Sequence, residues 1–166
     1  RLIGTIITDG KDEVCLASRS GKAIRFKETD VRPMGRSTRG VKGMNINKED
    51  KVISIIKVNP DSNLLTLSEN GYGKRTNISE FGGQKRGGKG VIALNTSDRN
   101  GMMVAAVQVL DGDEVMLIGN KGTLIRTQVD QISVIGRNTQ GVKVVSTRED
   151  EKLVDAVGFK ESLDEE

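Results

Sequence analysis

The chain has 166 residues, of which 35% are apolar and 30% charged, and its formal net charge is +3. This length is typical of one domain or two small ones, and apolar residues in clear blocks argue against a disordered chain. One cysteine and no histidine exclude an internal disulfide framework, argue against a zinc site and remove the commonest general base. No apolar run approaches the about 20 residues of a membrane span, and we recognise no signal peptide.

The sequence repeats with a period of about fifty residues, and each copy predicts the same strands. Asp12-Glu13-Val14 recurs as Asp113-Glu114-Val115, and Ser62-Asn63-Leu64 is a degenerate copy between them. Each triplet opens a short apolar run that predicts a buried first strand, at residues 14–17, 64–67 and 115–118. The lone Cys15 lies in the first run and is interpreted as a small core residue.

A turn with glycine follows in every copy (Ser20-Gly21, Asn70-Gly71, Lys121-Gly122) and predicts a hairpin to a second strand. The second strands share an arginine at the same position: Arg25, Arg75 and Arg126. Alternation along a strand places these arginines on the face opposite Ile24 and Ile125. Two interpretations stay open, namely solvated strand positions or a basic row repeated around the array.

A loop with arginine and glycine comes next, at residues 34–40, 84–90 and 135–141. The three copies align at Arg36, Arg86 and Arg137, and at the glycines Gly40, Gly90 and Gly141. The middle copy, called the heptad below, is Gln84-Lys85-Arg86-Gly87-Gly88-Lys89-Gly90, without acid or apolar side chain. Its glycines and cations favour a backbone turn that cradles a polyanion, although a solvated turn has the same composition.

The valine after each loop begins a third predicted strand, and the fourth predicted strands cover residues 52–58, 103–109 and 153–157. Residues 2–7 align with the strand at 52–56, which predicts the fourth strand of a preceding unit. The chain thus divides into an orphan strand (1–9), three four-stranded units (10–58, 59–109 and 110–159) and an acidic tail (160–166). We expect an all-β fold of propeller-like blades that forms part of a larger disc, because closed propellers have about four to eight blades.

No catalytic motif emerges from the repeats. Residues 82–89 lack the Ser or Thr and the following helix of a Walker loop. The acids at Asp12 and Asp113 recur at strand starts, which indicates turn chemistry. Tyr72 aligns with Lys22 and Thr123, so the repeat reserves no position for a nucleophile. We expect no catalytic residue, no metal and no cofactor in this chain.

The heptad resembles the basic glycine-rich box in the C-terminal domain of the DNA gyrase A subunit. Residues 70–76, residues 134–142 and the acidic ending at 164–166 are also similar to that family, so the resemblance covers essentially the whole chain. It implies a β-pinwheel, a propeller-like disc of about six blades, with this chain as its C-terminal half. In the family the box usually lies in the first blade, so the heptad is either that box or a second copy.

The resemblance implies binding and wrapping of duplex DNA without sequence preference. The expected DNA-binding residues are those of the heptad and the loop and strand arginines: Gln84, Lys85, Arg86, Gly87, Gly88, Lys89, Gly90, Arg36, Arg39, Arg137, Arg25, Arg75 and Arg126. Expected partners are duplex DNA, the remaining blades and strand-passage core of the same polypeptide, and the gyrase B subunit, with no membrane. The parent would be an ATP-dependent type II topoisomerase of the bacterial cytoplasm, associated with the nucleoid, with ATP and Mg²⁺ bound outside this chain.

Three alternatives remain. The nearest is the equivalent domain of topoisomerase IV, a sibling that lacks the full box. A propeller-type protein-interaction domain with a solvated basic rim comes from a different class. A small-molecule hydrolase on a propeller scaffold is disfavoured, because histidine is absent and no acid cluster stands outside the repeat.

Overall fold

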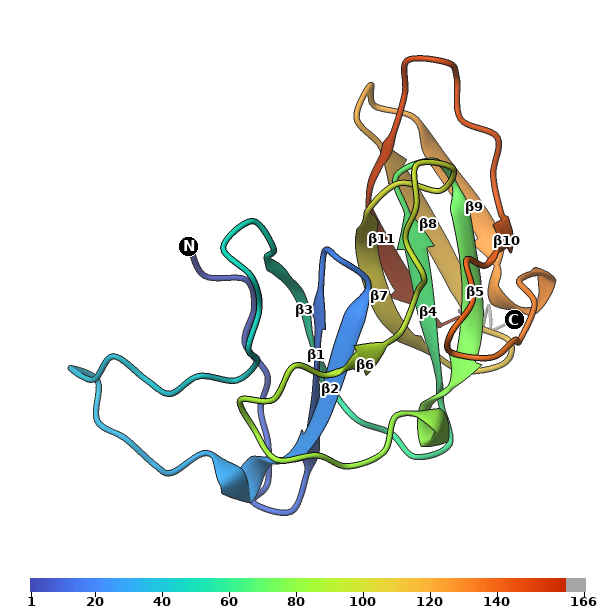
Figure 1. The fold of residues 1–166 in the computed structure, drawn as a ribbon. Helices are drawn as coiled ribbons and strands as arrows, with labels where there is room; N and C mark the ends of the chain where they lie inside the picture. The colour runs from blue at the N-terminus through green and yellow to red at the C-terminus, as the bar shows by residue number, and fades with distance from the viewer. Residues whose placement is uncertain (161–166) are drawn as a thin grey trace.

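The computed structural model describes residues 1–160 and shows an all-β fold (Figure 1). Its strands are β1 (Glu13–Ser18), β2 (Lys22–Lys27), β3 (Val52–Lys57), β4 (Asn63–Ser68), β5 (Tyr72–Asn77), β6 (Val91–Ile92), β7 (Met103–Val109), β8 (Glu114–Gly119), β9 (Leu124–Gln128), β10 (Val142–Lys143) and β11 (Leu153–Phe159). Single 3₁₀ turns follow the second strand of each repeat, at η1 (Glu28–Asp30), η2 (Ile78–Glu80) and η3 (Val129–Gln131). No helix among these residues is long and apolar enough to span a membrane. The expected acidic tail falls almost entirely outside the described residues.

The first two strands of each repeat form the predicted hairpins. β1 pairs with β2, β4 with β5 and β8 with β9, all antiparallel, and the arginines of the second strands lie opposite Cys15, Leu65 and Met116. The hairpin turns have positive φ at Gly21 (90°) and Gly71 (84°), a conformation that glycine adopts without steric cost. The predicted first, second and fourth strands of all three repeats are therefore confirmed.

In both four-stranded sheets, the strand beside the second strand of the hairpin comes from the following repeat. The sheet orders are β3-β1-β2-β6, β10-β5-β4-β7 and β11-β8-β9, so β6 and β10 join the sheet of the repeat before their own. Our assignment of this third strand to its own blade is wrong. The reason lies in the loop, since the N–H of Gln84 donates to the carbonyl of Arg25 (2.7 Å) and leads the chain to the preceding blade. The boundaries 10–58, 59–109 and 110–159 therefore describe sequence repeats and not blades, because the first two sheets each contain a strand from the following repeat.

Two other expected strands do not form. Residues 1–12 contain no strand, and neither does the segment after Val41. The fourth strands β3, β7 and β11 already occupy the free edges of β1, β4 and β8, so the orphan strand predicted at residues 1–9 has no ladder to join. By the pattern of β6 and β10, the segment after Val41 would pair with the second strand of the repeat before its own, and no such strand lies among residues 1–12.

The core lies between consecutive sheets. One apolar cluster joins the first and second sheets through side chains such as Cys15, Leu64 and Phe81, and a second joins the second and third sheets through Leu67 and Leu117. Burial of such a side chain stabilises the fold by about 1.5–3 kcal/mol. Cys15 is fully buried as predicted, and burial raises the pKa of its thiol to about 12.

The sheets are arranged like blades. β7 lies beside both β3 and β11, so the edges formed by these fourth strands converge. The exchanged strands β6 and β10 occupy the opposite edges. The loops that precede the exchanged strands are therefore carried on the outer side of the array (Figure 1).

Candidate nucleic-acid interface

The loop that follows the second strand of each repeat carries cations and no carboxylate, at residues 31–48, 81–97 and 131–148. We call them the acid-free loops, since all of the 23 Asp and Glu residues lie elsewhere. They hold 11 of the 26 Lys and Arg residues, namely Arg32, Arg36, Arg39, Lys42, Lys48, Lys85, Arg86, Lys89, Arg137, Lys143 and Arg148. None of these takes part in an ion pair among residues 1–160. Sequence reasoning concentrated on the loop motifs and missed the wider signal, which is the regular spacing of the acids around each loop.

The acid-free loops touch one another in chain order. The N–H of Asn45 donates to the carbonyl of Gly88 (2.8 Å), and the N–H of Gly87 donates to that of Gly43 (2.7 Å). The N–H of Asn95 in turn donates to the carbonyl of Thr139 (2.8 Å). The three loops thus form one continuous surface across the blades.

The heptad divides into exposed cations and a docked backbone. Gln84, Lys85 and Lys89 are exposed, and neither lysine forms a side-chain hydrogen bond or ion pair with the described residues. Gly87 and Gly90 have φ of 85° and 74°, in the left-handed region. The glycines shape the turn, and the two lysines are left to attract an anion.

The aligned arginines of the second and third loops brace these loops against the preceding repeat. Arg86 donates from Nε to the carbonyl of Asp30 (3.1 Å) and from a terminal nitrogen to that of Lys42 (2.5 Å). Arg137 donates in the equivalent way to the carbonyl of Ile92 (3.0 Å). Both guanidinium groups are therefore partly engaged in holding the loops in place. Arg36 and Arg39 are exposed and make no such bond to the described residues.

The arginines of the second strands do not form an exposed basic row. Arg25 pairs with Glu13 and donates to the carbonyl of Ile78 (3.2 Å), in the next repeat. Arg75 is only 6% exposed and donates to the carbonyl of Ile132 (2.7 Å). The structure thus contradicts both interpretations for these two residues, because the guanidinium groups face the next blade and satisfy its carbonyl oxygens.

Arg126 differs from the other two strand arginines. It is exposed, pairs with Glu114 and lies over the ring of Phe159, with its guanidinium carbon 5.0 Å from the ring centroid. No following repeat covers it among the described residues. Its charge is balanced by the neighbouring carboxylate, which makes it a weaker candidate for phosphate contact than the loop lysines.

Sequence reasoning did not single out Lys74, a fully buried lysine under the third loop. Its ammonium group donates to the carbonyls of Gly136 (2.8 Å), Arg137 and Thr139 (3.1 Å), and to the Thr139 hydroxyl (2.9 Å). Burial lowers its pKa to about 8; the nearby charge of Glu80 raises this pKa and that of Arg137 lowers it. The available signal was a lysine where the other repeats have isoleucine, on the face predicted to be buried.

Lys74 predicts a change of stability with pH. Its folded pKa of about 8 lies below the ordinary 10.5, so between these pH values the unfolded chain holds a proton that the folded chain has released. The free energy of unfolding should therefore rise with pH across this window. Lys74→Met should lack that rise, whereas Lys27→Met, which alters an exposed lysine of β2, should keep it. Urea denaturation across the window checks this, and identical profiles for the wild type and Lys74→Met would contradict it.

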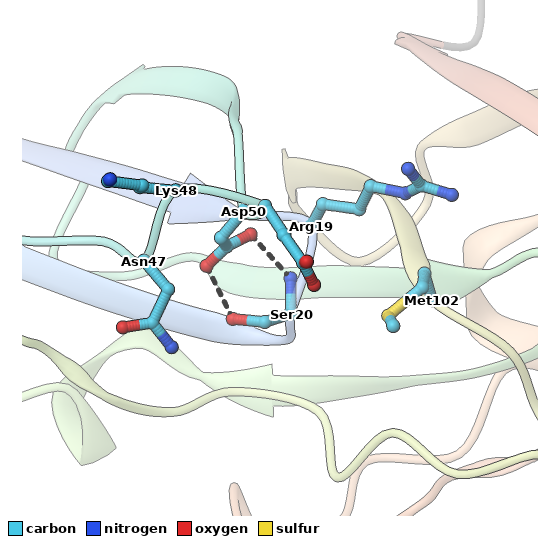
Figure 2. Close-up of a pocket in the computed structure, with 7 residues that line it drawn as sticks. Arg19, Ser20, Asn47, Lys48, Asp50 and Met102 are labelled. Carbon is cyan, nitrogen blue, oxygen red and sulfur yellow. Dashed lines mark hydrogen bonds between the residues drawn. The ribbon is translucent and has the colours of Figure 1, made fainter.

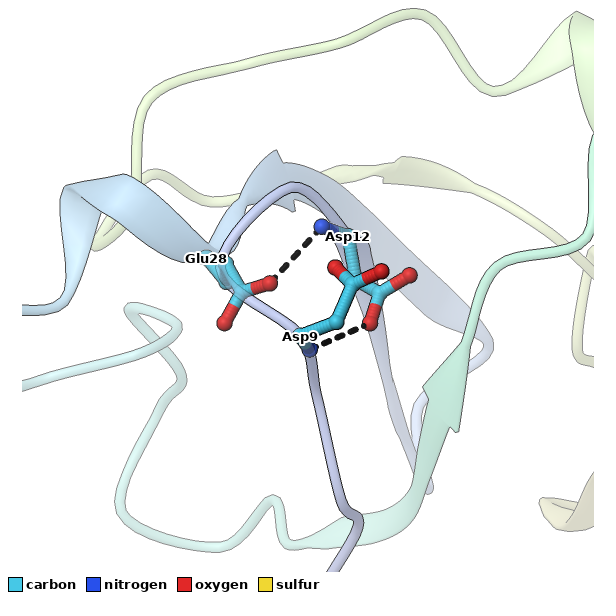
Figure 3. Close-up of side chains that lie close together, drawn as sticks. All are labelled: Asp9, Asp12 and Glu28. Atoms are coloured by element: carbon cyan, nitrogen blue, oxygen red, sulfur yellow. Dashed lines mark hydrogen bonds between the residues drawn. The ribbon is translucent and has the colours of Figure 1, made fainter.

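Asp9, Asp12 and Glu28 bring three carboxylates together (Figure 3). Glu28 accepts two N–H groups of the turn at 2.7 Å, and Asp12 accepts the N–H of Asp9 at 3.0 Å. Burial opposes ionisation of Asp12, but the N–H of Asp9 and the ammonium of Lys57 leave its pKa lowered. In the third repeat Asp113 and Asp130 accept turn N–H groups in the same way. This recurrence agrees with the interpretation as turn chemistry.

A pocket of about 600 Å³ lies beside the first hairpin turn (Figure 2). Its central carboxylate, Asp50, accepts the N–H of Ser20 (2.9 Å) and its hydroxyl (2.6 Å). Burial opposes ionisation of Asp50, but these hydrogen bonds leave its pKa lowered. The carboxylate therefore closes the turn, and its lowered pKa makes it a weak base toward the Ser20 hydroxyl that donates to it.

The fold and this surface define a class: a propeller-like β-domain whose blades exchange their outer strands and whose outer side carries cations that form no ion pair with residues 1–160. A family model described as "DNA gyrase C-terminal domain, beta-propeller" matches residues 12–59, 62–109 and 113–157. The chain belongs to this family. The resemblance inferred from the heptad and the expected fold class are both confirmed.

Relatives and solved structures agree with this assignment. The DNA gyrase A subunit of Escherichia coli K12 is 49% identical over 165 residues, covering 99% of this chain and 19% of that protein. Its counterpart in Pseudomonas aeruginosa is 52% identical over 153 residues, covering 92% and 17%. A structure of the DNA gyrase A C-terminal domain matches with a TM-score of 0.83 at 32% identity, covering 90% of this chain and 51% of that one. The C-terminal domain of DNA topoisomerase IV matches with 0.86 at 26% identity, covering 92% and 48%.

The chain therefore spans about a fifth of the length of these two relatives and about half of the solved domains.

Proposed function

We propose that this chain binds duplex DNA without sequence preference and wraps it along the acid-free loops, as part of a DNA gyrase A subunit. One observation carries the proposal: eleven cations lie on three contiguous loops, and no carboxylate among the described residues pairs with any of them. Lysine and arginine that contact phosphates release counterions, which drives binding without reading the bases.

The placement of these loops on consecutive blades supports wrapping. A duplex that follows the loops from blade to blade must bend, at a cost of about 1–6 kcal/mol for a site of 20–30 bp. Many phosphate contacts offset this cost, as they do in architectural proteins. The exposed Lys85 and Lys89 and the arginines Arg36 and Arg39 are the residues that we assign to phosphate contact.

The larger role is part of the same proposal. In the longer protein, the wrapped DNA would be presented to a strand-passage core, so that ATP-driven passage adds negative supercoils. The core, the remaining blades and the gyrase B subunit would be its partners in the bacterial cytoplasm, and ATP and Mg²⁺ would act outside this chain. The topoisomerase IV domain is a second candidate because its structure matches with a TM-score of 0.86. The heptad and the gyrase names of the relatives favour gyrase.

A linking-number experiment tests wrapping directly. Nicked circular DNA is resealed with and without the chain at several salt concentrations, and the topoisomers are separated. We expect a shift in linking number that increases with protein and disappears at high salt, because phosphate contacts weaken as counterions compete. Binding at saturation without any shift would reduce the proposal to simple DNA binding. Absence of binding to any duplex would overturn it.

A further inference from the structure

The only tyrosine of the chain lies between two cations on the outer side of the second sheet. Tyr72 begins β5, and Lys143 lies directly opposite it in the exchanged strand β10. Arg99 comes from the segment before β7. The guanidinium carbon of Arg99 is 5.2 Å from the ring centroid of Tyr72, and the ammonium nitrogen of Lys143 is 5.8 Å from it. We call these three residues the tyrosine cluster.

The tyrosine cluster has unused capacity for an anion. Arg99 donates from Nε to the Tyr72 hydroxyl (3.3 Å), which leaves the hydroxyl proton without an acceptor among residues 1–160. Neither Arg99 nor Lys143 forms an ion pair with a described carboxylate. The hydrogen bond from Arg99 lowers the pKa of the Tyr72 hydroxyl; burial opposes this shift, and the positive charges of Arg99 and Lys143 add to it. An anion beside the hydroxyl would relieve the repulsion between the two cations.

The tyrosine cluster lies where the loop motif loses its lysines. The positions of Lys85 and Lys89 in the heptad correspond to Gly136 and Gln140 in the third loop. Within residues 135–141 the motif therefore keeps one cation, Arg137, which is engaged in bracing. The side chain of Asn100, next to Arg99 in the chain, donates to the carbonyl of Gln140 (3.3 Å), so the cluster lies beside this depleted loop.

We propose that Tyr72, Arg99 and Lys143 form a phosphate-binding site that takes one backbone phosphate of duplex DNA at the seam between the second and third repeats. The two cations supply charge-assisted hydrogen bonds and the Tyr72 hydroxyl supplies a third donor. The site replaces the missing loop lysines and continues the path of the DNA beyond the heptad. This inference rests on the proposed DNA binding and adds Tyr72 and Arg99, which lie outside the acid-free loops.

The test compares two double variants of the whole chain, each of which loses two positive charges. Arg99→Gln with Lys143→Gln should weaken binding of a fluorescent duplex about tenfold at about 0.1 M salt, and should reduce the salt slope by about 0.9, the effect of one phosphate contact. Lys11→Gln with Lys57→Gln removes the same charge from the turn at 9–12 and from β3, on the edge away from the exchanged strands. This control should leave the slope unchanged.

The tyrosine itself provides a second measurement, because the chain contains one Tyr and no Trp. Inorganic polyphosphate, which presents phosphates without absorbing bases, should change the fluorescence of Tyr72 in a saturable way. Arg99→Gln with Lys143→Gln should abolish this change. Tyr72→Phe, which keeps the ring but removes the hydroxyl, should weaken DNA binding with no loss of the thermal unfolding transition.

The outcomes separate the two proposals. If Lys85→Gln with Lys89→Gln weakens DNA binding but the cluster variants and the polyphosphate signal show no effect, the tyrosine cluster is not a phosphate site and the proposed function stands. If the wild-type chain binds neither DNA nor polyphosphate, the proposed function itself is wrong.

Discussion

Replacing Lys85 and Lys89 together by glutamine is expected to weaken binding of duplex DNA by about two orders of magnitude at about 0.1 M salt. Both side chains are exposed, and neither contacts a described carboxylate. Each lost phosphate contact should remove about 0.9 from the slope of log affinity against log salt, or about tenfold in affinity at this salt concentration. Binding of a labelled duplex over a salt series measures both quantities.

The same substitution should leave the stability of the domain almost unchanged, because surface substitutions usually alter it by less than about 0.5 kcal/mol. The matched control is again Lys11→Gln with Lys57→Gln, which lowers the net charge equally. An equal loss of affinity in both double variants would show that total charge, and not the heptad, governs binding. A lost unfolding transition in Lys85→Gln with Lys89→Gln would instead make the heptad structural.

Gly90→Ala is expected to destabilise the domain far more than Gly40→Ala, although the two glycines share φ of 74°. A Cβ on Gly90 would lie 2.5 Å from the carbonyl oxygen of Ala23 in β2, whereas a Cβ on Gly40 would meet nothing within 4 Å. Gly40→Ala therefore measures backbone strain alone, at about 1–2 kcal/mol. Gly90→Ala adds a clash with the strand that β6 joins, so it should displace the exchanged strand.

Urea denaturation of both variants measures the difference in the free energy of unfolding. Equal losses of stability would contradict the close approach between Gly90 and Ala23. Gly141 gives an independent check, because a Cβ there would lie 2.6 Å from the carbonyl oxygen of Gly73 in β5. Gly90 and Gly141, which end the second and third loops, are thus first docking residues, and the DNA contact expected for Gly90 stays a prediction.

The shared arginines show how far the sequence alone could assign the candidate site. Their alignment predicted a common task for Arg86 and Arg137, and the structure gives both the task of holding carbonyl groups of the preceding repeat. The alignment said nothing about which oxygen atoms lie within reach. The same limit applies to the arginines of the second strands. The same strand position is exposed at Arg126 in the third sheet, whereas Arg25 and Arg75 face the next blade.

The sequence by itself determined the repeat, the first, second and fourth strands of each unit, the propeller-like class and the family. These features follow from the local alternation of apolar residues, from turn glycines and from the heptad, and none of them depends on which blade lies next to which. The acid-free loops were also determined by the sequence, since the spacing of the carboxylates is visible there.

Only the tertiary structure decided which sheet each strand joins and which cations remain available to an anion. β6 and β10 are short strands whose partner is set by hydrogen bonds from the docked loop, and a repeat alignment does not contain those bonds. Lys74 is equally instructive, because a lysine on a buried face becomes acceptable only where another repeat supplies carbonyl oxygens for its ammonium group. Pairing and burial of charges depend on neighbours far apart in the chain.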